Sequence, residues 1–137
     1  MKKIAMTAAV LMMATMTAFA GKAEREYKKE TLDPAVKAAE TAYKSSCGCA
    51  LKVTVAKDIL NSQDDMSQAR YIAQSVSEGA AGYCTDDESK KAVCQMKTLE
   101  ISKGKETAFS FKSGKGSAVT DGQSYVSFDM MTRELDK

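Results

Sequence analysis

Four cysteines are the residues whose types and spacing could do chemistry in this 137-residue sequence. Cys47 and Cys49 form a Cys-Gly-Cys motif, and Cys84 and Cys94 follow later in the chain. Cysteine side chains can form disulfides, exchange with other disulfides or bind soft metal ions. The choice among these depends on the compartment and on the elements that bring the sulfur atoms together.

The composition excludes several common catalytic designs. The sequence contains no histidine, so it cannot form a Ser-His-Asp triad, a Cys-His pair or an HExxH zinc site. It contains no tryptophan, and aromatic residues make up 7% of the chain, which disfavours platforms that stack on nucleic-acid bases. We therefore predict no catalytic residue and no bound cofactor or metal, and the sequence does not favour an enzyme.

Residues 1–20 have the layout of a secretory signal peptide. Lys2 and Lys3 form a basic start, an uncharged stretch follows, and the small residues Ala18 and Ala20 mark a cleavage site after Ala20. We therefore predict an exported protein, periplasmic or extracellular, that keeps no stable membrane anchor after cleavage.

Removal of the signal peptide also changes the charge of the protein. The 20 lysine and arginine residues fall to 18 when Lys2 and Lys3 are lost, which equals the 18 aspartate and glutamate residues. Because the mature chain is then neutral, its charge gives no support for a nucleic-acid partner.

The rest of the sequence predicts a polar N-terminal arm over residues 21–32 and a single α+β domain over residues 33–137. Asp33 and Pro34 are typical of a helix start, since Asp can cap the helix and Pro suits its first turn. Ser62, followed three residues later by Asp65, gives the capping signature of a second helix.

Four segments predict strands. Residues 50–57 alternate strictly between apolar and polar, as expected for a half-buried strand. Three further strands are predicted over residues 96–102, 107–112 and 124–132, while residues 117–121 fit either a strand or a loop. The element order is therefore α-β-α-β-β-β. It predicts an α+β domain, stapled by disulfides, with helices packed on one face of a four-stranded antiparallel or mixed sheet.

An even number of cysteines in an exported chain favours disulfides. The first predicted strand starts just after Cys49, the second helix ends just before Cys84, and the next strand starts near Cys94. If these two strands run parallel, as in a right-handed crossover, all four sulfur atoms gather at one end of the sheet. This arrangement favours bridges from the Cys-Gly-Cys motif to Cys84 and Cys94.

A second pairing would join Cys84 to Cys94 and Cys47 to Cys49. The bond within the Cys-Gly-Cys motif closes a very tight ring, so it would be strained and easily reduced. Such a bond could serve thiol–disulfide exchange, and four converging thiolates, or the motif alone, could instead bind zinc or copper.

Other patterns have structural explanations beside functional ones. Gly114-Lys115-Gly116 resembles the end of a phosphate-binding loop but also fits a hairpin turn. The acidic run at residues 86–88 could suggest a cation site, but acids also suit the first turn of a helix. Tyr71, Tyr83 and Tyr125 could form an exposed recognition patch, although partly buried structural tyrosines are commoner.

The sequence as a whole favours an exported, non-catalytic binding module that two disulfides stabilise, with an unknown protein or small ligand as its partner. The uncovered sheet face or the cysteine-rich end would bind that partner. The alternative is a thiol–disulfide redox or soft-metal (copper or zinc) handling protein that uses the Cys47-Gly48-Cys49 motif.

Overall fold

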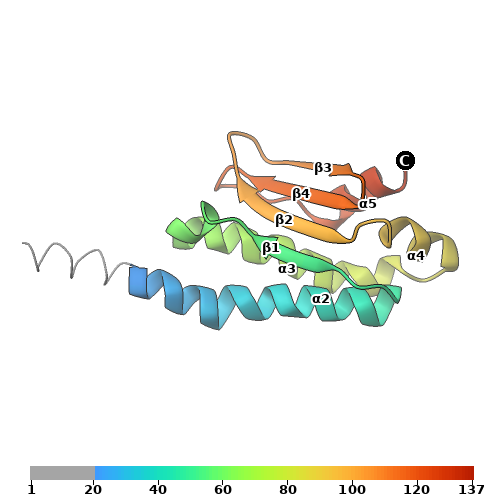
Figure 1. Cartoon of the computed structure of the whole chain (residues 1–137), viewed down its shortest axis with the longest axis horizontal. Coiled ribbons are helices and arrows are strands. Elements are labelled where there is room, and N and C mark those ends of the chain that lie inside the picture. Colours follow the sequence, from blue (N-terminus) through green and yellow to red (C-terminus); the bar gives the residue numbers. More distant parts are fainter. Residues whose placement is uncertain (1–20) are drawn as a thin grey trace, which may run out of the picture.

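The computed structural model describes residues 21–137, so the predicted signal peptide at residues 1–20 lies outside the described residues. Helices and a four-stranded mixed sheet build the domain (Figure 1), which confirms the predicted α+β class. Among the described residues, no helix has both the length and the apolar character needed to span a membrane.

The first described segment is helical, where the sequence predicted a loose polar arm. Residues 21–27 are α-helical, η1 (Lys28–Leu32) is a π-helical stretch, and α2 (Asp33–Cys47) continues without a break. Leu32 is fully buried, and the Tyr27 hydroxyl shares a hydrogen bond of 2.8 Å with the Ser67 hydroxyl. These two contacts attach a highly charged segment to the rest of the fold.

The remaining elements follow in chain order after α2. They are β1 (Lys52–Val55), η2 (Ile59–Asn61), α3 (Gln63–Tyr83), α4 (Asp87–Val93), β2 (Thr98–Lys103), β3 (Ala108–Lys112), β4 (Lys115–Thr120) and α5 (Phe128–Leu135). The Ser62 side chain caps α3 by accepting a hydrogen bond of 3.4 Å from the backbone N–H of Asp65, as its sequence signature predicts.

The strands are arranged in the order β1-β2-β4-β3. β1 runs parallel to β2, β2 runs parallel to β4, and β3 pairs with β4 in antiparallel fashion. β4 therefore inserts between β2 and β3, which precede it in the chain. The parallel register of β1 and β2, with Lys52 beside Thr98, places the starts of both strands at the same end of the sheet.

The strand predicted over residues 124–132 is wrong, because this region contains the start of α5. The Ser127 side chain caps the helix by accepting a hydrogen bond of 3.3 Å from the backbone N–H of Met130. The buried positions of α5 have helical spacing; they are Phe128, Met131, Thr132 and Leu135. The fourth strand is β4, which covers most of the segment that fitted either a strand or a loop.

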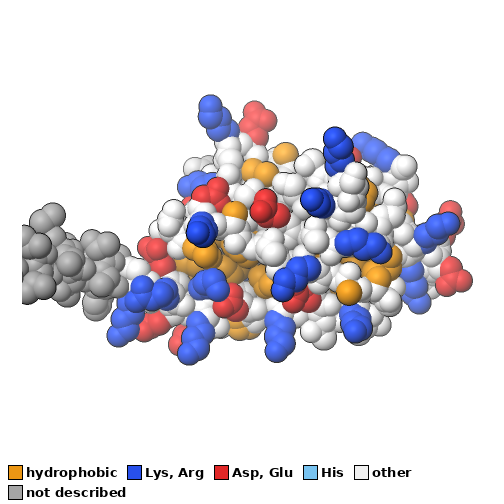
Figure 2. Space-filling model, viewed as in Figure 1, with side chains coloured by type: hydrophobic (Ala, Val, Ile, Leu, Met, Phe, Trp, Pro, Cys, Tyr) orange, Lys and Arg blue, Asp and Glu red, His pale blue; other side chains and the backbone are white. Residues whose placement is uncertain are grey.

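The sequence predicted that the helices pack together on one face of the sheet, but only some of them do so. α3 and α5 pack against one face, and in Figure 1 they lie behind the strands, whereas α2 packs on α3 and flanks the edge strand β1. Leu99 and Ile101 of β2 are fully buried on the covered side, and Glu100 between them is exposed. Figure 2 shows the uncovered face, where basic and acidic side chains are scattered over the surface with smaller hydrophobic areas between them.

Candidate functional site

The four cysteines gather at one end of the sheet and form two disulfides. Cys47, the last residue of α2, is bonded to Cys84, which follows α3, with the two Cα atoms 5.2 Å apart. Cys49 is bonded to Cys94, which follows α4, with a Cα separation of 5.8 Å. Each cysteine of the Cys-Gly-Cys motif therefore has a partner outside the motif, as the parallel β1–β2 arrangement favoured.

Gly48 separates the two bridges by changing the direction of the chain. Its φ angle of 80° is left-handed, and its backbone N–H donates a hydrogen bond to the carbonyl of Lys44, which ends α2. Left-handed backbone favours glycine because a side chain would be strained there. The turn directs Cys47 toward α3 and Cys49 toward α4, so the bond between Cys47 and Cys49 that the redox hypothesis requires is not formed.

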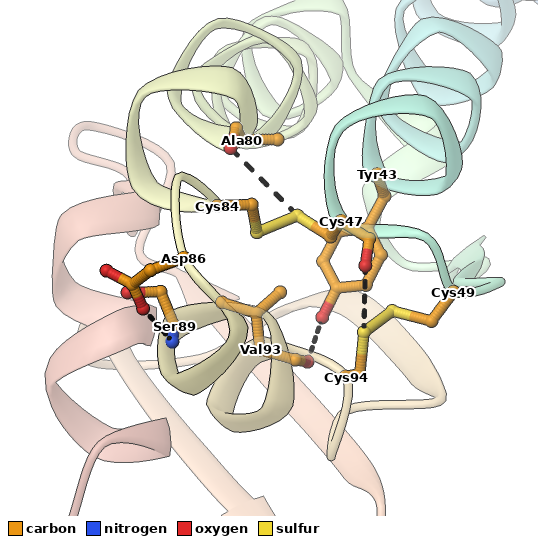
Figure 3. The surroundings of a disulfide bond; sticks show 9 residues. All are labelled: Tyr43, Cys47, Cys49, Ala80, Cys84, Asp86, Ser89, Val93 and Cys94. Carbon is orange, nitrogen blue, oxygen red and sulfur yellow. Dashed lines mark hydrogen bonds between the residues drawn. A yellow bond between two sulfur atoms is a disulfide. The ribbon is translucent and has the colours of Figure 1, made fainter.

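Tight packing surrounds the two bridges (Figure 3). The sulfur of Cys47 lies 3.9 Å from the carbonyl oxygen of Ala80, and the sulfur of Cys94 lies 3.4 Å from the carbonyl oxygen of Cys47. Since a disulfide sulfur carries no proton, these are packing contacts. Cys47 and Cys84 are only 3% and 6% exposed, whereas Cys49 and Cys94 are half-buried.

Tyr43 holds the same end of the fold together through a hydrogen bond. Its side chain is fully buried, and its hydroxyl donates to the backbone carbonyl of Val93, at the end of α4. Burial raises the pKa of the Tyr43 hydroxyl far above its usual value, so in the folded protein the hydroxyl keeps its proton and remains a donor into alkaline solution. The cysteine-rich end is therefore closed by two disulfides and a buried hydrogen bond, and all four cysteines are bonded. Two disulfides suggest a location outside the reducing cytosol.

The geometry does not support a metal site among the described residues, either at the cysteines or at the acidic run of residues 86–88. Within residues 21–137, no group of three or more cysteine, aspartate or glutamate side chains is placed to hold a metal ion. Asp86 instead caps α4 by accepting a hydrogen bond of 2.8 Å from the backbone N–H of Ser89. This hydrogen bond is the main reason why the pKa of Asp86 is lowered.

The motif that resembles a phosphate loop belongs to the hairpin between β3 and β4. Ser113 and Gly114 both have positive φ angles, 50° and 82°, as a two-residue hairpin turn requires. No helix follows this turn, because Lys115 already begins β4. The segment therefore connects two strands and lacks the helix N-terminus that binds phosphate in such loops.

Two of the three candidate tyrosines lie together on the surface. Tyr71 of α3 and Tyr125 of the loop before α5 are 37% and 42% exposed, and their ring centroids are 5.5 Å apart. The guanidinium carbon of Arg70 lies 4.7 Å from the centroid of the Tyr71 ring, within the range of a cation–π contact. We call these three residues, Arg70, Tyr71 and Tyr125, the tyrosine patch.

A groove of about 430 Å³ lies between α3 and α5, next to the tyrosine patch. Tyr71 is one helical turn before Ser75, and Tyr125 is two residues before Ser127; Ser75 and Ser127 both line the groove. The full lining consists of Ser75, Glu78, Gly79, Gly82, Tyr83, Ser127, Phe128, Asp129 and Thr132. We refer to it as the α3–α5 groove.

Tyr83, the third candidate, lies in the α3–α5 groove apart from the other two. Its ring meets that of Phe128 edge to face, with a centroid distance of 6.1 Å. Burial raises the pKa of the Tyr83 hydroxyl, and the Asp136 and Asp86 carboxylates raise it further. Two carboxylates, those of Asp136 and Asp86, therefore lie near this end of the groove.

The groove itself carries two more carboxylates, Glu78 and Asp129. Glu78 accepts a hydrogen bond of 2.8 Å from the Gln74 side chain, and Asp129 forms an ion pair of 2.7 Å with Arg133. These interactions are those of an acidic, solvated surface. Sequence reasoning missed the groove because α5 was not foreseen, although the spacing of Tyr71, Ser75 and Gly79 along α3 already indicated one helix face.

Comparisons of this chain with protein-family models, with curated proteins and with solved structures found no match.

Proposed function

We propose that this chain is an exported, non-catalytic module that binds a partner protein through the tyrosine patch and the α3–α5 groove. The observation that carries the proposal is the contact between two exposed tyrosines, Tyr71 and Tyr125, with Arg70 against one of them. Tyrosine and arginine are enriched among the residues that contribute most to protein–protein binding, since they combine a rigid apolar surface with a polar tip.

The charge of the groove defines the chemistry of the partner. Glu78 and Asp129 line it, and Asp136 and Asp86 act on Tyr83 at its far end. A segment that carries apolar or aromatic residues together with lysine or arginine complements these features, because opposite charges both steer association and specify the partner. The proposed partner is therefore a basic, partly apolar protein segment.

The proposed function also includes export of the protein from the cytoplasm. The two disulfides support an oxidising compartment, and residues 1–20 have the composition of a cleavable signal. N-terminal sequencing of the protein recovered outside the cytoplasm is expected to begin at Gly21. Recovery of the full chain from the cytoplasm with free thiols would contradict this part of the proposal.

Site-specific photo-cross-linking in the native host tests the binding surface. A photoreactive phenylalanine analogue is placed at Tyr71, at Tyr125 or, as a control, at Thr54, which is exposed on the opposite side of the sheet. We expect the same discrete protein adduct from positions 71 and 125 and none from position 54. No adduct at either tyrosine, or the same adduct at Thr54, would contradict the proposal.

A further inference from the structure

The two edges of the sheet differ in what covers them. The β1 edge is flanked by α2, and the Glu40 carboxylate of α2 accepts a hydrogen bond of 2.8 Å from the backbone N–H of Val53. At the opposite edge, Figure 1 shows β3 with no helix or strand of the described chain beside its outer side. An open edge can pair with a strand of another molecule.

The hydrogen bonds of β4 determine which backbone groups β3 presents. The carbonyls of Gly114 and Thr120 accept hydrogen bonds from Thr98 and Gly104, on the β2 side of β4. The backbone N–H and C=O groups of successive residues alternate in direction along a strand. The backbone groups of Ser117 therefore point toward β3, where Ser117 pairs with Ser110.

The backbone groups of the two residues that flank Ser110 point away from β4, toward the open edge of the sheet. Alternation directs the backbone N–H and C=O groups of Phe109 and Phe111 away from the sheet. Within the described residues, no hydrogen bond involves these outward groups. β3 therefore offers two complete donor–acceptor pairs to an added strand.

Apolar side chains accompany these open backbone groups. The rings of Phe109 and Phe111 are half-buried on the helix side of β3, and Met130 of α5 is 38% exposed. A hollow of about 210 Å³ is lined by Phe109, Met130, Arg133 and Glu134. Natural edges are often protected by proline, a bulge or central charges, whereas β3 carries its one charged residue, Lys112, at its end.

We propose that the β3 edge pairs with the β3 edge of a second copy of this chain, in antiparallel fashion, about a two-fold axis at Ser110. In this register Phe109 exchanges two hydrogen bonds with Phe111 of the second copy, and the symmetry repeats them. Ser110 faces its own copy in a non-hydrogen-bonded pair, where Cα atoms are about 4.5 Å apart. The two four-stranded sheets become one continuous sheet.

The charges of the segment favour a second copy over an unrelated strand. In this register Lys112 lies opposite Ala108 of the second copy and diagonally from its Glu106, so opposite charges meet twice about the axis. Two copies of α5 approach on the helix side, each with an exposed Met130 between charged neighbours of both signs. The edge is thus complementary to itself in hydrogen bonding, apolar surface and charge, as a two-fold interface requires.

Cysteine cross-linking of the full chain tests this register. Ser110→Cys places two thiols across the axis at a distance suited to a disulfide, whereas Ala108→Cys, on the same face of β3, places them four residues out of register. We expect an oxidised covalent dimer from S110C, joined at position 110, and no covalent dimer from A108C when both are analysed under denaturing, non-reducing conditions. Equal cross-linking of both variants, or attachment of S110C to a different protein from the host, would overturn the proposal.

A proline variant separates strand pairing from loss of the phenylalanine ring. Phe111→Pro removes an N–H that β3 does not use within the fold, and proline is tolerated at such outward edge positions; Phe111→Val keeps the N–H. Sedimentation equilibrium is expected to show a dimer for the wild type and for F111V. The dissociation constant of F111P should be higher than that of F111V by about tenfold to a hundredfold, because two hydrogen bonds are lost. A monomeric wild type, or equal constants for the two variants, would overturn the proposal.

Discussion

Glu40 on α2 accepts a hydrogen bond at 2.8 Å from the backbone N–H of Val53, on the edge strand β1. Val53 is only 5% exposed, so removal of the carboxylate leaves a buried donor without its partner. We predict that Glu40→Ala lowers the free energy of unfolding by about 1–2 kcal/mol and speeds hydrogen exchange at the Val53 amide. Lys37→Ala, one turn earlier on α2, should change neither, and unaltered exchange at Val53 in E40A would contradict the role of Glu40.

The Tyr43 hydroxyl provides a second test of the packing, at the cysteine-rich end. Tyr43→Phe keeps the buried ring but removes the donor to the Val93 carbonyl. We predict that the free energy of unfolding, measured with urea, falls by about 1–3 kcal/mol, because a buried acceptor loses its partner. Tyr27→Phe is the matched control and should cost less, since the Tyr27 hydrogen bond is only partly buried.

The raised pKa of Tyr43 also predicts the pH dependence of stability. The folded state holds the hydroxyl proton to higher pH than the unfolded chain, in which the tyrosine pKa is about 10. Above about pH 10 the unfolded state therefore binds fewer protons, and stability falls by at most about 1.4 kcal/mol per pH unit from this group. The stability difference between the wild type and Y43F should be constant below that pH and shrink above it; a difference that grows would contradict the assignment.

The two disulfides should differ in their accessibility to reductants. Cys49 and Cys94 are half-buried, whereas Cys47 and Cys84 are nearly fully buried. We predict that a mild phosphine reduces the Cys49–Cys94 bond first, as followed by alkylation and peptide mass mapping. Replacing Cys49 and Cys94 together by serine should lower the free energy of unfolding by about 2–4 kcal/mol, because the bond closes a long loop. Initial reduction of Cys47–Cys84 would contradict the packing described here.

Two glycines of α3 form a matched pair for testing the α3–α5 groove. A Cβ atom on Gly79 would lie 2.7 Å from Cδ2 of Phe128, whereas one on Gly82 would meet no atom within 4 Å. We predict that Gly79→Ala displaces Phe128 and weakens the photo-cross-link at position 71. Gly82→Ala should leave Phe128 in place and stabilise α3 by up to about 1 kcal/mol. Because Gly82 also lines the groove, we expect this substitution to weaken the cross-link less than Gly79→Ala does. An equal loss of cross-linking in both variants would contradict the role of Phe128 displacement, and no loss in either variant would contradict a role of the groove in binding.

The sequence favoured bridges from the Cys-Gly-Cys motif to Cys84 and Cys94, because this arrangement depends on elements with strong local signals. The alternation after Cys49 and the capping signature at Ser62 specify a strand followed by a helix. A parallel return of the chain then brings Cys84 and Cys94 to the start of that strand. Local pattern and chain direction brought the four cysteines together, but they did not determine which cysteine of the motif bonds to Cys84, which depends on the left-handed turn at Gly48.

The C-terminal part of the fold was missed because the segment from Val126 to Met130 fits two periods at once. Val126, Phe128 and Met130 alternate as in a strand, but Ser127 caps a helix whose buried face is set by contacts with α3. The strand β4 was not clearly predicted because its small residues give little apolar alternation. A Cβ on Gly116 would collide with the sulfur of Met96, so the packing requires glycine at a strand position where the sequence pattern indicates a turn.

The most direct test of the central claim is a double-mutant cycle on Tyr71 and Tyr125, measured as affinity for the partner captured by cross-linking. Each Tyr→Ala substitution is predicted to weaken binding by at least about tenfold. Because the rings lie 5.5 Å apart, the double mutant should lose less than the sum of the single losses, by about 0.5–1.5 kcal/mol. Affinities that match the wild type and a Thr54→Ala control in all three variants would contradict the claim that these tyrosines form one binding surface.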